Sequence, residues 1–159
     1  FNFITAYPFA NLMVNDVEAG VPQSVSVPVI AGADEGMLEF HIAKANPAFP
    51  AIQSAGQARA LFRGPNAHIS PSWYRDRFVD GDRSKTAPTW NYVETNVIIR
   101  DIEPMGQQDL VRHLERLVGQ FEDASTGWRF SEIDPDILNG WSQHIAGFRG
   151  AFDSGLLIL

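Results

Sequence analysis

The chain contains no cysteine, and this absence excludes several kinds of site. Without thiols there can be no disulfide, no zinc site built on thiolates and no cysteine nucleophile. Long apolar runs are lacking too, because no stretch approaches the ~20 residues that a membrane-spanning helix needs. No signal-peptide pattern is visible either. We therefore expect a cytoplasmic protein with no membrane partner.

Basic residues are scarce. Twelve lysines and arginines stand against nineteen acidic residues, which gives a net charge of −7 and a pI near 4.9. Such a chain repels the phosphates of a duplex unless it carries a local basic patch. The tightest basic group is interleaved with aspartates over residues 75–85, a pattern typical of a solvated loop. Direct binding to nucleic acid is not expected.

The motifs of common catalytic sites are missing as well. There is no G-x-S-x-G, P-loop or G-x-G-x-x-G sequence, so no serine nucleophile or classical dinucleotide fold is indicated. The four histidines, His41, His68, His113 and His144, do not have metal-ligand spacing, and no metal site is predicted. His113 lies beside the apolar stripe of a predicted helix and is expected to pair with Asp109 in a structural role.

The length of 159 residues suits a single domain spanning residues 1–159. Because the chain opens on Phe1, we expect both of its ends to be truncated. Short apolar or alternating runs predict strands at 10–15, 20–30 and 37–43, with Gly20 in the first turn. Further strands are predicted on each side of a turn at Gly64-Pro65, at 58–64 and 67–70, and a long one at 90–102.

Helical patterns appear between and after these strands. Asn46 as cap and Pro47 in the first turn predict a short helix over 47–55, ended by Gly56. Apolar residues from Leu110 to Phe121 recur at helical spacing, and a second helix is predicted to begin with Asp134 as its cap. The tail at 155–159 is predicted to be a strand. Strands followed by two helices indicate an α+β, mainly β fold, with an antiparallel barrel preferred to a sandwich.

Two stretches combine residue types that could bind a ligand. "FHIAKANP" (40–47) places a His, a Lys and an Asn where a strand meets a helix, an arrangement that suits either a ligand phosphate or a plain surface lysine. "APTWNY" (87–92) and the earlier Trp73-Tyr74 place aromatic rings beside prolines and turns, where core strands seldom have them. A planar ligand, a subunit interface and core packing remain alternatives for these rings.

The ordered blocks "HIAKANP", "FRGPNAHISPSWY", "PTWNY" and "HIAGF" resemble the signature of the PaiB-type negative transcriptional regulators, a family of FMN-binding split-barrel proteins related to pyridoxamine-phosphate oxidases. The resemblance implies a six-stranded antiparallel split β-barrel with a short helix after the third strand and two C-terminal helices. It also implies a homodimer with FMN at the subunit interface. Lys44 would meet the FMN phosphate, and the other implied cofactor-binding residues are Val27, Pro28, His41, Asn46, Ser70, Trp73, Tyr74, Thr89, Trp90 and Asn91.

The sequence departs from the family pattern at several positions. Asn66 stands where the family has a histidine, His68 where it has a tyrosine, and Phe40 where it has a glycine. Three functions therefore remain open: an FMN protein that is a flavin-dependent oxidoreductase, a regulator that acts by binding, and a barrel dimer that has lost FMN and binds another planar molecule such as haem through His41 or His68. No catalytic residue is identified, as expected where the flavin carries the redox chemistry.

Overall fold

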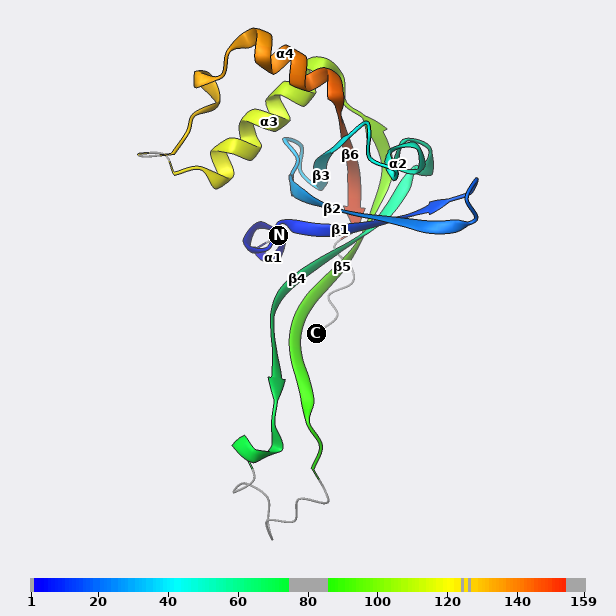
Figure 1. Ribbon diagram of the computed structural model, residues 1–159, viewed down its shortest axis with the longest axis vertical. Helices are drawn as coiled ribbons and strands as arrows, with labels where there is room; N and C mark the ends of the chain where they lie inside the picture. The colour runs from blue at the N-terminus through cyan, green and yellow to red at the C-terminus, as the bar shows by residue number, and fades with distance from the viewer. Residues whose placement is uncertain (1, 75–85, 124, 126, 154–159) are drawn as a thin grey trace.

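The structure is a computed structural model that describes residues 2–74, 86–123, 125 and 127–153 (Figure 1). The basic group at 75–85 and the apolar tail at 155–159 lie outside these residues. In chain order the elements are α1 (Asn2–Ala6), β1 (Phe9–Asp16), β2 (Val21–Ala31), β3 (Met37–Ala43), α2 (Phe49–Ala55), β4 (Gln57–Ile69), the 3₁₀ turn η1 (Pro71–Trp73), β5 (Thr89–Pro104), α3 (Gln107–Phe121), the 3₁₀ turn η4 (Phe130–Glu132), α4 (Pro135–His144) and β6 (Ile145–Asp153).

Six antiparallel strands close into a ring in the order β1-β2-β3-β6-β5-β4. β1 and β2 form the predicted hairpin, in which Gly20 has φ 69°, a value that glycine adopts without strain. The predicted fold class, a mainly β antiparallel barrel with helices, is confirmed.

The alternation predicted for β3 sets the position of the core. Leu38, Phe40 and Ile42 point into the ring, and the ring of Phe40 stacks on that of Phe148 in β6 with centroids 5.6 Å apart. Glu39 and His41 take the opposite face. The other large, fully buried side chains of the described core are Phe62, Leu12, Ile52, Ile99 and Val29.

The short helix α2 packs its buried Ala51 and Ile52 onto this core. It begins at Phe49, two residues later than predicted, with Pro50 in its first turn. Asn46 does not cap the helix itself; its Oδ1 accepts a hydrogen bond from the Ala48 amide in the turn before it, at 2.9 Å. Gly56 ends the helix with φ 62°, as predicted.

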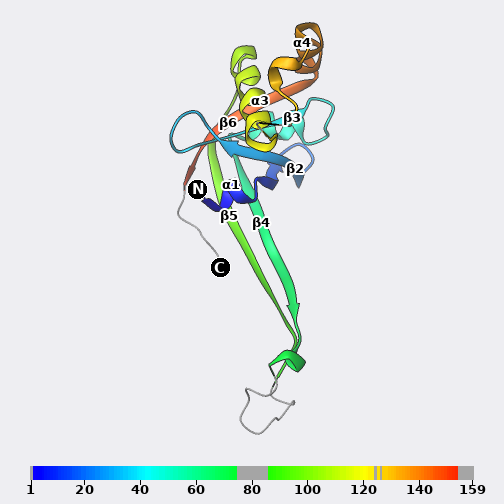
Figure 2. The same ribbon diagram turned by 90° about the vertical axis from the view of Figure 1, so that its left-hand side faces the viewer.

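The predicted turn at Gly64-Pro65 is wrong. β4 runs through this dipeptide as one strand of 13 residues, and the irregularity is absorbed by a register shift between Arg63 and Asn66 against β5. Pro65 is tolerated there because the pairing to β5 is interrupted at the shift. Beyond it, β4 and β5 leave the ring together as a long two-stranded projection (Figures 1 and 2). We refer to residues 63–74 and 86–94 as the arm.

The two predicted helices are α3 and α4, and α4 begins as expected. The Asp134 side chain accepts hydrogen bonds from the amides of Asp136 and Ile137, and Pro135 occupies the first turn. A further strand, β6, follows α4 directly and completes the ring between β3 and β5, a role that the sequence patterns did not reveal. In the part of the chain that the structure describes, no helix is long and apolar enough to cross a membrane.

Candidate functional site

The predicted site residues fall into two groups, and the first surrounds the end of β3. We call His41, Lys44 and Asn46, together with Val27 and Pro28 of β2, the barrel group. The Lys44 ammonium donates a hydrogen bond to the backbone carbonyl of Gln143 at 2.8 Å, and the side chain is otherwise exposed. Val27 is a core side chain, so it can offer a ligand backbone groups only. Pro28 precedes Val29, which pairs with Phe40 and so brings Pro28 next to His41.

The second group lies at the far end of the arm and comprises Ser70, Trp73, Tyr74, Thr89, Trp90 and Asn91. Thr89 faces Ile69 and Trp90 faces His68 across the β4–β5 pair. The Ser70 hydroxyl caps η1 by accepting from the Ser72 amide at 3.2 Å. Trp73 and Trp90 expose 69% and 60% of their surface, so neither ring belongs to the core of its own chain.

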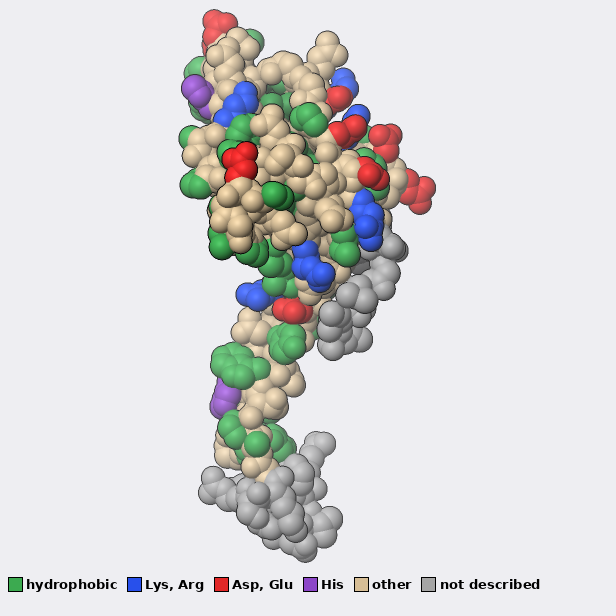
Figure 3. Space-filling model, turned by 90° about the vertical axis from the view of Figure 1, so that its right-hand side faces the viewer, with side chains coloured by type: hydrophobic (Ala, Val, Ile, Leu, Met, Phe, Trp, Pro, Cys, Tyr) green, Lys and Arg blue, Asp and Glu red, His purple; other side chains and the backbone are tan. Residues whose placement is uncertain are grey.

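The barrel group and the arm group do not meet within one chain. The arm projects away from the ring of strands (Figure 1), and hydrophobic side chains lie along it on the face drawn in Figure 3. A shallow cavity of about 380 Å³ on the arm is lined by Arg63, Gly64, Asn66, Trp90, Tyr92, Val93 and Glu94. None of these residues belongs to the barrel group. The single chain therefore presents two separate halves of the predicted site.

A third cluster, which the sequence patterns did not reveal, lies between the outer face of β3 and helix α3. His113 is fully buried there, and its Nδ1 lies 3.2 Å from Oε2 of Glu39. Its Nε2 lies 3.0 Å from Nδ1 of His41, with the two rings edge to face. The predicted pairing of His113 with Asp109 is wrong, since Asp109 binds Arg112 instead.

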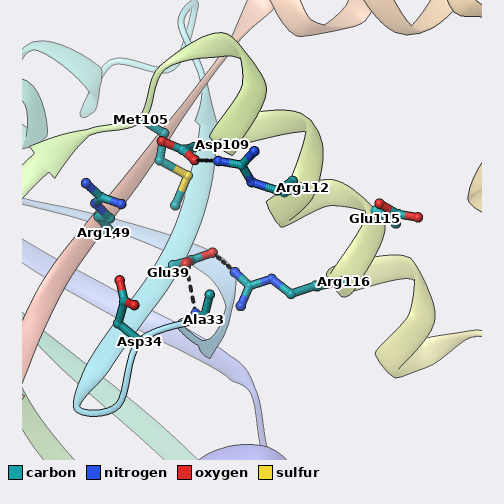
Figure 4. A pocket seen from close by; sticks show the side chains of 9 residues that line it. All are labelled: Ala33, Asp34, Glu39, Met105, Asp109, Arg112, Glu115, Arg116 and Arg149. Atoms are coloured by element: carbon teal, nitrogen blue, oxygen red, sulfur yellow. Dashed lines mark hydrogen bonds and ion pairs between the residues drawn. The ribbon is translucent and has the colours of Figure 1, made fainter.

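Glu39 is the anchor of this cluster. Its carboxylate accepts hydrogen bonds from Arg116 on Oε2 and from the Ala33 amide on Oε1 (Figure 4). Burial would raise the pKa of Glu39, but the His113 hydrogen bond and the Arg116 charge outweigh it and hold the pKa below its usual value. The carboxylate is therefore ionised at neutral pH.

His41 is neutral under the same conditions. Burial, reinforced by the charge that His113 can carry, lowers the pKa of His41 to about 4. A neutral imidazole cannot serve as a fixed cation for a phosphate. Of the barrel group, only Lys44 can supply full positive charge to a ligand.

A cavity of about 380 Å³ adjoins this cluster on the side of α3 (Figure 4). Its walls carry both signs of charge, and each arginine has an acidic partner: Arg112 binds Asp109, Arg116 binds Glu39 and Arg149 binds Glu103. The cavity is lined by Ala33, Asp34, Glu39, Met105, Asp109, Arg112, Glu115, Arg116 and Arg149. Because the arginines are already paired, this cavity is a weaker anion site than the surroundings of Lys44.

The pairing of His113 with β3 lies beyond what local patterns can show. The alternation of β3 places Glu39 and His41 on one face, but nothing local indicates that a helix more than 70 positions later covers that face. The buried residues of α3 are Leu110 and His113, whereas Phe121, at the end of the predicted apolar stripe, is half exposed. The signal that the sequence offered was the position of His113, three residues after Leu110 and therefore close to the same face of the helix.

The sequence of this chain matches a known protein family and a characterised bacterial protein. Residues 1–152 match a protein family described as "Putative FMN-binding domain". The chain is 23% identical over 154 residues to protease synthase and sporulation protein PAI 2 of Bacillus subtilis, covering 94% of this chain and 68% of that protein.

Two solved structures share the fold at low sequence identity. The flavocytochrome Anf3 of Azotobacter vinelandii superposes with a TM-score of 0.63 at 14% identity, covering 94% of this chain and 60% of its own. An FAD- and haem-binding protein of Mycobacterium smegmatis gives a TM-score of 0.60 at 12% identity, with 96% and 64% covered. The chain thus spans less than two thirds of these two structures. Because the family match covers nearly the whole sequence, this chain belongs to the FMN-binding, PaiB-type split-barrel family.

Proposed function

We propose that this chain binds FMN at a site made by two copies of the chain, with the barrel group of one copy and the arm group of the other on opposite sides of the cofactor. Within this proposal the protein is a flavin-dependent oxidoreductase. When bound, FMN would supply the hydride or electron transfer, and the chain would hold and orient it.

One observation carries the proposal: the two groups of predicted site residues are separated within the chain, and the aromatic rings of the arm are exposed. Tyr92, a third aromatic residue of the arm besides Trp73 and Trp90, is 55% exposed. Several exposed aromatic rings gathered on one projecting ribbon favour a surface where something binds. An isolated two-stranded ribbon is also marginally stable in water, so the arm gains stability when a partner covers it.

The chemistry of the two groups fits FMN. Lys44 uses one of its three ammonium hydrogens on the Gln143 carbonyl and has two left for a phosphate. The arm supplies flat rings that can stack on an isoalloxazine, and the hydroxyl and amide groups of Ser70, Thr89 and Asn91 can bind its polar edge. A planar, phosphorylated cofactor uses both halves, whereas a simple anion uses only the first.

An absorption spectrum of the purified, undenatured protein tests the proposal. We expect flavin bands, and mass spectrometry of the material released on denaturation should identify FMN. Addition of FMN to the apoprotein should quench flavin fluorescence with saturation. Protein that neither carries a flavin nor takes up added FMN would overturn the proposal.

Haem is the second candidate ligand, because two histidines could reach it. Nε2 of His41 has no hydrogen-bond partner among the described residues, and His68 is exposed on the arm with its ring edge-on to Trp90 at 5.7 Å. A neutral imidazole nitrogen of this kind is a good ligand for haem iron. A Soret band on addition of haemin, lost in His41→Ala or His68→Ala, would favour haem over FMN.

A regulatory role, if the protein has one, is proposed to be indirect. The net charge of −7 opposes contact with DNA, and the described helices do not form a helix-turn-helix reader. A gel shift with a steep dependence on salt concentration would contradict this part of the proposal.

A further inference from the structure

The cluster of Glu39, His113 and His41 holds an unbroken line of hydrogen bonds from a buried carboxylate to the edge of the barrel group. Its two links measure 3.2 Å and 3.0 Å. Every buried side-chain nitrogen and oxygen of the described residues has a hydrogen-bond partner. Nε2 of His41 has none, so this atom is reached by solvent and forms the open end of the line.

The positions of the protons follow from the chemistry of the partners. The Glu39 carboxylate, held by Arg116, can only accept, so Nδ1 of His113 must carry a proton. In neutral His113 the other nitrogen is then an acceptor, which requires a proton on Nδ1 of His41. Neutral His41 is consequently left with an unprotonated Nε2, a solvent-reached hydrogen-bond acceptor.

One added proton converts Nε2 of His41 from a hydrogen-bond acceptor into a donor. A donor at Nε2 of His41 gives its proton to that nitrogen, and His41 passes its Nδ1 proton to Nε2 of His113. The products are the deprotonated donor and an imidazolium at His113, and no other bond changes. The charge thus comes to rest beside the Glu39 carboxylate, where an opposite charge stabilises it, while His41 stays neutral.

We propose that Glu39, His113 and His41 form a proton relay that exchanges one proton with a hydroxyl, a protonated ring nitrogen or a water in the candidate site. His113 and Glu39 are positioning residues in this scheme, because they act on the ligand through His41. The proposal rests on the proposed function only for the identity of the bound molecule. The relay itself is present in the chain without any cofactor.

Other charged groups surround the cluster and bear on its titration. Helix α3 contributes Asp109, Arg112 and Arg116, the segment before β3 contributes Asp34, and β6 contributes Arg149. The Arg116 guanidinium is bonded to Glu39 and opposes a positive charge on His113, whereas Glu39 itself favours it. Removal of the Glu39 charge would leave the effect of Arg116 unopposed.

Nuclear magnetic resonance of the imidazole nitrogens tests the relay directly in the cofactor-free full chain. With only four histidines, the exposed His68 and His144 serve as internal references. In the wild type at neutral pH we expect protons on Nδ1 of both His41 and His113, with Nε2 of His41 unprotonated. A proton on Nε2 of His41 at neutral pH would overturn the proposal.

Two variants sharpen this result. In His113→Leu, Nδ1 of His41 loses its hydrogen-bond partner, and the proton on Nδ1 of His41 should move to Nε2 of the same ring. His144→Gln, a control at an exposed site, should leave the tautomer of His41 unchanged. In Glu39→Gln, the midpoint for uptake of the first proton by the His41–His113 pair should fall by about one pH unit or more. An unchanged tautomer in the folded His113→Leu variant, or an unchanged midpoint in the folded Glu39→Gln variant, would also overturn the proposal.

The wild-type spectrum decides the question if either variant fails to fold. Failure of the proposed function is a separate result: a protein that takes up no FMN would defeat the FMN proposal and leave the histidine tautomers as expected here.

Discussion

Lys44 and Gln143 lie 99 positions apart in the sequence, yet the Lys44 ammonium donates a hydrogen bond of 2.8 Å to the Gln143 carbonyl. A second bond of 2.8 Å runs from the Lys44 amide to the carbonyl of His144. The last turn of α4 therefore fixes both the backbone and the side chain of the residue proposed to meet the cofactor's phosphate.

Replacing Lys44 by alanine should weaken FMN binding by about tenfold to a hundredfold, the usual worth of a hydrogen bond to a charged group. Riboflavin, which lacks the phosphate, should bind the variant and the wild type equally. Fluorescence titration with both flavins measures the difference. Arg59→Ala is the matched control, since it removes an exposed positive charge from β4 outside the barrel group. Equal weakening of FMN and riboflavin would remove Lys44 from the phosphate-binding role.

Replacing Trp73 and Trp90 together by alanine should abolish self-association and FMN binding while leaving the fold intact. Both rings are largely exposed in the single chain, so the stability of the monomer should change by about 0.5 kcal/mol or less for each. Sedimentation velocity and circular dichroism measure the two effects. Trp141→Ala, at a tryptophan of α4 that is 59% exposed, is the control and should leave association unchanged. Loss of folded structure in the double variant would show that the arm rings belong to a monomer core.

Phe148→Ala should destabilise the barrel by about 3–5 kcal/mol, the usual cost of deleting a buried ring. Phe148 is 1% exposed and contacts the rings of both Phe40 and Phe49. Urea unfolding followed by circular dichroism measures the change. Phe9→Ala is the control, because Phe9 is 64% exposed on β1 and its loss should cost about 0.5 kcal/mol or less. Similar losses from the two substitutions would contradict the assignment of the core.

The elements that the sequence predicts well are those with a local physical cause. The alternation at 37–43 follows from a strand with one face in the core, and it correctly places Phe40 on the core face and Glu39 on the opposite face. Asp134 and Pro135 mark the start of α4 through hydrogen bonds and a backbone angle that depend only on neighbouring residues.

The missed elements depend on distant contacts. β6 contains glycines that weaken a local strand signal, yet a Cβ at Gly150 would lie 2.6 Å from Cγ2 of Ile99 and 2.7 Å from the Arg100 carbonyl oxygen. Gly150 is required by the close approach of β5, which only the folded ring brings about. The continuity of β4 through Gly64-Pro65 likewise depends on its pairing with β5.

In the candidate site, too, local features could be predicted from the sequence and distant contacts could not. The sequence blocks predict the residues of the barrel group and the arm group, but they do not show that the arm carries its residues away from the barrel. The partners of His113 lie 72 and 74 positions away from it, so no pattern along the helix could name them.

Acid should destabilise the protein, because the fold keeps His41 neutral at pH values where the unfolded chain protonates it. The pKa of His41 lies at about 4 in the fold against about 6.5 in the unfolded chain, so the unfolded state binds more protons between these values. Stability should fall as the pH drops from 6.5 towards 4, by about 3 kcal/mol at most. The lowered pKa of Glu39 adds a loss that begins near pH 4.5 and grows as the pH falls through its folded value. Urea unfolding at a series of pH values measures the slope.

His41→Gln should flatten this dependence between pH 6.5 and 4.5, since the variant lacks the group that titrates. His144→Gln, at an exposed position of α4, should leave the slope as it is. A wild-type stability that stays constant over this range would contradict the neutral state of His41.

Native mass spectrometry of the FMN-loaded protein tests the shared cofactor site most directly. If the barrel group of one copy and the arm group of another enclose the flavin, the spectrum should show two chains with two FMN molecules and no FMN on single chains. A single chain that carries FMN by itself would contradict the account.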